Sequence, residues 1–303
     1  MTEGAEPSLL TREDVRQLER FSLDSLEAIN VGIVGQREGA GRGVGLEFAD
    51  YRPYTPGDDL RRIDWNVFAR LRELVVKTAP RESRASLSVM LDASRSMDLG
   101  APNKLHYGRR LAALLGTVAL LRSDAIQVQV LSDGNAVAAG QLDAPGMLAA
   151  LAFEVRQLPS GRTTQLERSV RRARMSSAAP ELAVLISDCL TPRDDLNGAL
   201  RQLGQSATAA TLLHVLDPTE ASPALRGSVE LQDRETGERR VATMTDELEH
   251  RYLEHYRQFL DATRAACRAN GIHYLPTSTS VDPLELLTES ARRGLLLQAR
   301  SGA

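Results

Sequence analysis

The 303-residue sequence lacks the features that would mark a redox, membrane or nucleic-acid-binding protein. Its two cysteines, Cys189 and Cys267, are far apart and lack metal-ligand spacing, so we interpret them as free thiols in a reducing compartment. The longest apolar run, 111–121, is interrupted by a glycine and a threonine and is far shorter than the roughly 20 residues that span a bilayer. The 37 basic and 40 acidic residues nearly balance, so no overall field favours nucleic acid or an anionic membrane.

The first residues also lack the features of a secretory signal. MTEGAEPSLLTRED carries acidic residues where such a signal has a positive segment and an apolar core. We therefore expect a cytoplasmic protein without membrane insertion. The glycine-rich segment 35–45 lacks the Gly-Lys-Ser/Thr ending of a nucleotide-binding loop, so we interpret it as a surface loop.

What the sequence does have is an alternation of strand-like and helix-like segments. Buried-looking strands are predicted at 87–91, 126–131, 183–186, 211–215 and 272–275. Helices are predicted at 104–122, 146–156, 166–175, 194–203 and 245–269. This order predicts an α/β fold with a doubly wound, mostly parallel sheet. The tight turn Asp133-Gly134-Asn135 adds an antiparallel edge strand, and Ser228 to Thr243 predicts a second, polar hairpin outside the sheet.

Oxygen-bearing side chains follow two of these strands. The segment LSVMLDASRSMDLG ends its strand on Asp92, followed by Ser94 and Ser96, and LAVLISDCL ends on Asp188. Open α/β sheets place ligands at the carboxyl ends of their strands, and Mg²⁺ prefers oxygen ligands. These residues predict a divalent-cation site, although Asp and Ser after a strand also form ordinary turns and helix caps.

The same residues resemble the metal-ion-dependent adhesion site of von Willebrand factor A domains. That pattern has Asp-x-Ser-x-Ser, then a Thr in a glycine-rich loop, then an Asp after a later strand. The resemblance implies Mg²⁺, with Mn²⁺ as the alternative, held by Asp92, Ser94, Ser96, Thr164 and Asp188. Thr164 aligns if Leu166 matches the Leu of Gly-Gly-Thr-x-Leu; because the second glycine is absent, Thr163 is the alternative ligand.

A second block resembles the signature of the bacterial domain-of-unknown-function family fifty-eight (DUF58). It runs from Gly45 to Ser83 and has the family's motifs in order: Glu47-Phe48, Tyr51-Arg52, Gly57-Asp58-Asp59, Arg62-Ile63-Asp64-Trp65 and Ala69-Arg70. The resemblance implies a helix, glycine-rich loop and signature segment at 1–84 and a von Willebrand A-like domain at 85–300. It also implies two partners, a MoxR-type AAA ATPase and a client protein offering an Asp or Glu carboxylate, in the assembly or activation of other complexes.

Carboxylates and arginines are interleaved in the charged block 57–65. We favour an ion-pair latch to the sheet domain, made by Asp58, Asp59 and Asp64, over a second metal site, because arginines compete for these carboxylates. Trp65, the only tryptophan, is expected to be a buried anchor.

The sequence does not favour an enzyme. The histidines form no nucleophile–base pair with neighbouring residues, and His214 is expected to be a hydrogen-bonded core histidine. Asp92 resembles the nucleophile of magnesium-dependent haloacid-dehalogenase-type phosphatases, but Ser94 stands where those enzymes carry a second carboxylate as the general acid. A metal-dependent protein-binding module is therefore preferred, with a phosphatase-like hydrolase and a metal-free scaffold as alternatives.

Overall fold

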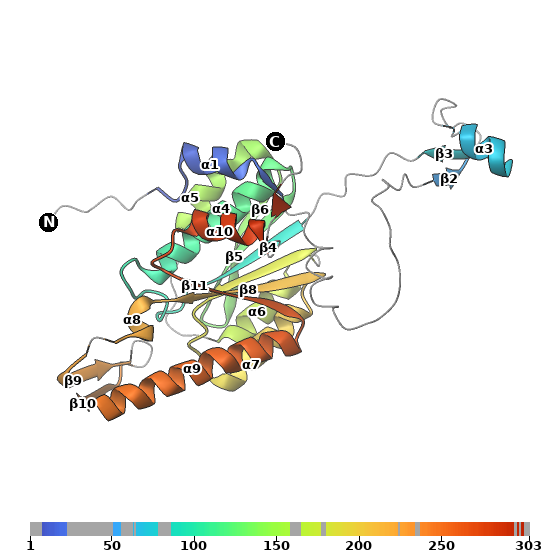
Figure 1. Cartoon of the computed structure of the whole chain (residues 1–303). Helices are drawn as coiled ribbons and strands as arrows, with labels where there is room; N and C mark the ends of the chain where they lie inside the picture. The colour runs from blue at the N-terminus through green and yellow to red at the C-terminus, as the bar shows by residue number, and fades with distance from the viewer. Residues whose placement is uncertain are drawn as a thin grey trace. The chain divides into compact units, whose positions relative to one another are not determined.

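The chain divides into two compact units. The computed structural model describes residues 8–22, 51–55, 63, 65–77, 86–157, 165–176, 180–223, 225–233, 237–293, 296 and 298–299. One unit comprises Met1–Val34 together with Ala85–Ala303, and the other comprises Gly35–Arg84 (Figure 1).

A six-stranded sheet of order β11-β8-β7-β4-β5-β6 forms the centre of the larger unit. Its strands are β4 (Ser86–Asp92), β5 (Ala125–Ser132), β6 (Asn135–Leu142), β7 (Leu182–Ser187), β8 (Ala209–Leu216) and β11 (Ile272–Ser278). All neighbours are parallel except β5 and β6, which pair antiparallel at one edge. This confirms the mostly parallel α/β sheet and the antiparallel edge strand predicted from the sequence.

The turn between β5 and β6 has the expected backbone. Asp133 and Gly134 connect the strands with φ angles of 48° and 70°. A two-residue hairpin turn of type I′ needs positive φ at both central positions, which Gly adopts freely and Asp tolerates. The local sequence therefore determines where the edge strand folds back.

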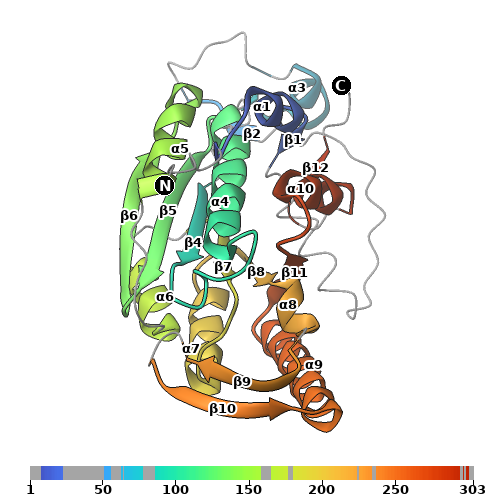
Figure 2. The same ribbon diagram turned by 90° about the vertical axis from the view of Figure 1, so that its left-hand side faces the viewer.

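Helices cover both faces of the sheet, as Figures 1 and 2 show. One face carries α4 (Lys104–Leu121), η2 (Pro145–Met147), α5 (Leu148–Gln157), α10 (Pro283–Arg292) and α1 (Arg12–Leu18); the other carries α6 (Leu166–Met175), α7 (Arg193–Gly204) and α9 (Asp246–Ala269). Val89 and Leu91 join the hydrophobic cluster on the first face, whereas Met90 joins the cluster on the second. Side chains alternate between faces along a strand, so an almost continuously apolar strand fills two cores.

Smaller elements extend the larger unit. Helix α1 begins after Thr11, whose side chain forms a capping box with Asp14, and β1 (Phe21–Ser22) pairs antiparallel with β12 (Gln298–Ala299). Beyond α8 (Pro218–Ala221), β9 (Gly227–Gln232) and β10 (Arg239–Met244) form a separate two-stranded sheet beside the N-terminal end of α9 (Figures 1 and 2). The predicted second hairpin outside the main sheet is confirmed.

The smaller unit contains α3 (Trp65–Leu71) and the antiparallel pair β2 (Tyr51–Pro53) and β3 (Val75–Lys77). The expectation that Trp65 is buried was wrong, because 59% of its surface is exposed and its ring meets Phe68 edge-on. In the smaller unit, Ile63 and Val76 are the buried residues among those whose burial the structure describes, and Phe68 beside Trp65 is itself partly exposed. Asp58, Asp59 and Asp64 lie outside the described residues, so the latch stays a prediction.

Candidate metal centre

The two aspartates predicted to bind metal lie where the sheet reverses its direction of growth. From β4 the chain adds β5 and β6 on one side and then returns to add β7 on the other side of β4. Asp92 ends β4, and Asp188 directly follows β7. A crevice forms at such a switch point because the loops leaving the two strands diverge, and open α/β sheets bind ligands there.

Asp92 is a buried carboxylate held by uncharged donors. The Ser94 backbone N–H donates to its Oδ1 at 2.9 Å, and the Ser187 hydroxyl donates to its Oδ2 at 2.7 Å. Within the described residues, no lysine, arginine or histidine forms an ion pair with Asp92. Burial, followed by the nearby charge of Asp188, raises the pKa of Asp92 to about 6. A cation at this position would relieve both penalties.

Two serine hydroxyls connect the aspartates. The Ser94 and Ser96 hydroxyl oxygens are 2.9 Å apart, and Ser96 donates to Asp188 Oδ1 at 3.2 Å. The structure thus brings Asp92, Ser94, Ser96 and Asp188 into one buried network. The contact between Asp92 and the Ser94 N–H also forms the ordinary turn that Asp after a strand can make without binding a metal. Thr163 and Thr164 lie outside the described residues.

The backbone after Asp188 has an uncommon conformation. Cys189 has a φ of 58°, in the left-handed region that non-glycine residues seldom adopt. Its N–H donates to the Ser187 hydroxyl at 2.9 Å, and the Leu190 N–H donates to Asp188 Oδ1 at 3.1 Å. Strain of this kind persists where surrounding contacts fix it, frequently at functional sites.

Burial raises the pKa of the Cys189 thiol well above its usual value, and both cysteines are free and buried. Their predicted role as free thiols is confirmed.

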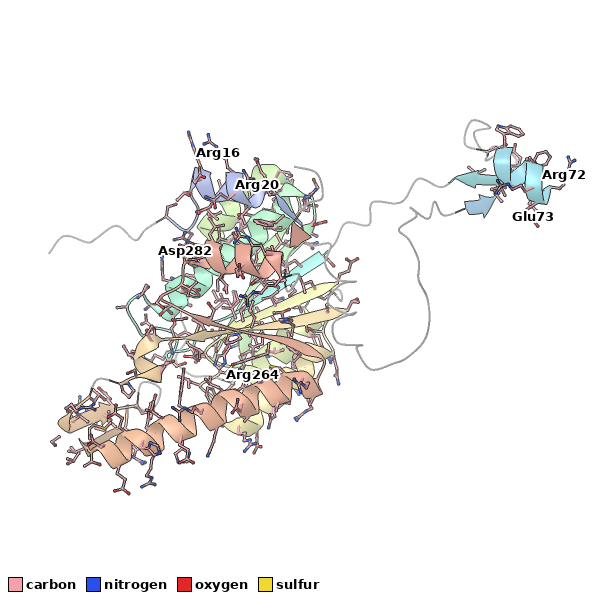
Figure 3. The ribbon with its side chains drawn as sticks, in the orientation of Figure 1. Arg16, Arg20, Arg72, Glu73, Arg264 and Asp282 are labelled. Atoms are coloured by element: carbon pink, nitrogen blue, oxygen red, sulfur yellow. The ribbon has the colours of Figure 1, made fainter. Side chains whose placement is uncertain are left out.

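His214 supports Asp188 from β8. Its Nε2 donates to the Asp188 carbonyl oxygen at 2.9 Å, so in the neutral ring Nδ1 accepts the Tyr274 hydroxyl, also at 2.9 Å. Burial lowers the pKa of His214 to about 4, which keeps the ring neutral at neutral pH. Arg264 of α9, labelled in Figure 3, lies over the Tyr274 ring. The interpretation of His214 as a hydrogen-bonded core histidine is confirmed.

Lys104 is the residue at this site that the sequence interpretation missed. Its side chain has no exposed surface, and its Nζ donates to Asp188 Oδ2 at 2.7 Å and to Glu220 Oε1 at 2.6 Å. Burial lowers the pKa of Lys104, but the charges of Asp188 and Glu220 outweigh it and the net pKa is raised. One signal was available: Lys104 is the first residue of α4, where the helix dipole disfavours a positive charge unless carboxylates are nearby.

The available donors are hard oxygen atoms. The described residues contain no group of three or more His, Cys, Asp or Glu side chains able to hold a metal. Two carboxylates with serine hydroxyls instead suit Mg²⁺ or Mn²⁺, which accept oxygen ligands and keep several waters, better than Zn²⁺ with its nitrogen and sulfur ligands. The donor set therefore fits the metal that the sequence resemblance implies.

The raised pKa of Asp92 predicts a specific pH dependence of stability in excess chelator. The pKa of 3.8 for an ordinary Asp rises to about 6 on folding, so the folded state binds more protons between these values and stability falls as pH rises. Relative to Asp92→Asn, the wild type should lose about 3 kcal/mol of unfolding free energy between pH values below about 3 and above about 7. Urea unfolding of both proteins at several pH values measures this difference. Parallel profiles would contradict it.

This α/β protein, which has oxygen donors at the switch point of its sheet, matches a known protein family. Residues 50–260 match the family described as "Protein of unknown function DUF58". The chain therefore belongs to this family, as its signature segment indicated.

Sequence relatives include the uncharacterized proteins Mb1516 from Mycobacterium bovis and Rv1480 from Mycobacterium tuberculosis. Each is 28% identical over 201 residues, which cover 64% of this chain and 62% of the relative. The chain thus spans about three fifths of the length of these relatives.

Similar solved structures include BatB, a conserved hypothetical protein from Bacteroides thetaiotaomicron, with a TM-score of 0.43 and 16% identity over 69% of this chain and 98% of that chain. Another is the SpRpn10 VWA domain, with a TM-score of 0.41 and 11% identity over 68% and 95% of the two chains. In the described part of this protein, no helix combines the length and apolar character needed to cross a bilayer.

Proposed function

We propose that this protein is a metal-dependent protein-binding module. Asp92, Ser94, Ser96 and Thr164 would hold Mg²⁺ or Mn²⁺, with Asp188 acting directly or through water. When bound, the metal would supply a positively charged coordination position for a carboxylate oxygen of a client protein. We further propose that the protein works in the cytoplasm beside a MoxR-type AAA ATPase in the assembly or activation of other complexes.

The observation that carries this proposal is the buried Asp92 without a paired cation among the described residues. It lies at the sheet's switch point, in a network that also contains two serine hydroxyls and a second aspartate. A structural turn would explain the Ser94 contact, but it would not explain why a carboxylate is kept in a place that disfavours its charge.

The residues at the candidate metal site have different roles. Ser187 and the Ser94 N–H orient the two oxygens of Asp92, and Ser96 links Asp92's loop to Asp188. His214 holds the backbone of Asp188, and Lys104 holds its side chain. Because Ser94 cannot act as a general acid at neutral pH, the proposal does not include catalysis.

Titration of the metal-free protein with Mg²⁺ and with Mn²⁺ distinguishes this function from its two alternatives. We expect binding of one ion per chain in a calorimeter, and no hydrolysis of a generic phosphomonoester such as p-nitrophenyl phosphate at saturating Mg²⁺. Turnover that requires Asp92 would favour the hydrolase. Absence of binding for both ions would favour the metal-free scaffold.

A further inference from the structure

Lys104 makes two strong contacts in a fully buried position. Its ammonium donates to Asp188 Oδ2 at 2.7 Å and to Glu220 Oε1 at 2.6 Å, and it has no exposed surface. Glu220 belongs to α8 and also accepts the Asp217 N–H through Oε2. The ammonium therefore joins the loop after β7 to α8 from the first turn of α4.

This ammonium changes what Asp188 can offer to a cation. Oδ2 faces Lys104, while Oδ1 accepts from the Ser96 hydroxyl at 3.2 Å and from the Leu190 N–H at 3.1 Å. Both oxygens thus already have donors, and one of these carries a full positive charge. Asp92, in contrast, has only uncharged donors within the described residues.

A purely structural ion pair would not need the contact between Lys104 and Asp188. Glu220 alone could neutralise the ammonium and fix α4 to α8, leaving Asp188 available at the strand end. Instead, Lys104 also contacts Asp188, whose carboxylate accepts a hydrogen bond from Ser96, another candidate ligand. Its positive charge lies beside the position proposed for a divalent cation, and in a buried site such charges interact strongly.

We propose that Lys104 is a positioning residue that sets the charge of the metal centre: its ammonium offsets the charge of Asp188, so that Asp92 is the candidate ligand carboxylate that no cation contacts among the described residues. The site is thereby held at low affinity for divalent ions, since affinity for such ions increases with the number of charged ligands. This inference rests on the proposed function, because a charge-setting residue acts on a cation.

The test uses the full-length chain and compares Lys104→Met with Lys104→Arg. Lys104→Met keeps most of the side-chain volume but removes the charge, so it should bind Mg²⁺ and Mn²⁺ at least about tenfold more tightly than the wild type. Lys104→Arg keeps the charge and should remain within about threefold of the wild type. Arg110→Met is the matched control, because Arg110 is also on α4 but pairs with Asp14 and Asp282. It should leave metal affinity unchanged.

A second readout separates a role in metal binding from a role in folding. Without the ammonium, repulsion among the carboxylates destabilises the metal-free protein, so saturating Mg²⁺ should raise the melting temperature of Lys104→Met more than that of the wild type. If Lys104→Met does not fold, Lys104→Met/Glu220→Gln removes one of the uncompensated carboxylates and is used in its place, with the same expected increase in affinity.

The outcomes separate this inference from the proposed function. Tighter metal binding by Lys104→Met than by the wild type supports the inference about Lys104. If Lys104→Met binds the ions and the wild type does not bind them at all, the inference holds and the proposed function of the natural chain falls. Binding by the wild type with unchanged or weaker binding by Lys104→Met overturns the inference alone. Failure of both proteins to bind either ion overturns both.

Discussion

Asp92→Ala is expected to abolish binding of Mg²⁺ and Mn²⁺ while leaving the fold intact. Asp92 would supply the main charge of the site, so we expect affinity to fall at least about 100-fold, more than for loss of a residue that only orients a ligand. The fold should survive because the substitution removes a buried carboxyl group whose pKa is raised to about 6 by burial and by the charge of Asp188. Calorimetry measures the affinity, and circular dichroism with thermal melting checks the fold.

Three further variants make this result specific. Ser94→Ala and Ser96→Ala remove uncharged donors and should weaken binding less, by about tenfold. Asp143→Ala is the control for loss of an acidic residue, because Asp143 is exposed and follows β6 at the opposite end of the sheet from Asp92. An Asp92→Ala protein that binds Mg²⁺ as tightly as the wild type would rule out this site.

Chelation is expected to release a MoxR-type AAA ATPase, or its client, from the immobilised protein. A carboxylate bound to a metal is held by a directional, charge-assisted contact, so binding should need both the cation and an acidic residue on the partner. Excess EDTA should therefore reduce capture of the purified partner to background, and Asp92→Ala with Thr164→Ala should do the same. Moderate salt should release only part of it, because a desolvated contact is poorly screened.

The control for this experiment restores the metal. Adding Mg²⁺ in excess of EDTA should recover capture by the wild type but not by the double variant. Capture that persists undiminished in chelator would mean that the metal is not the docking point, and segment 35–45 or the β9–β10 hairpin would become the next surfaces to test.

Several expectations about the fold followed from local sequence patterns. The alternation of apolar strands and helices predicted the parallel sheet, and Asp133-Gly134 predicted the turn to its antiparallel edge. The proximity of Asp92 and Asp188 was also predictable, because adjacent parallel strands bring their carboxyl ends to one edge. For Trp65, however, residue type alone suggested burial, whereas 59% of its surface is exposed.

The sequence by itself therefore determined the strand ends, their oxygen-bearing residues and the sheet that brings them together, because each depends on patterns within a few residues. Only the tertiary structure decided which charges meet there. Lys104 and Glu220 are 116 positions apart, and Lys104 and Asp188 are 84 apart, so no local pattern connects them. Their contact depends on how α4 and α8 pack at the end of the sheet, and burial there turns an ordinary lysine into a fixed charge beside the candidate metal centre.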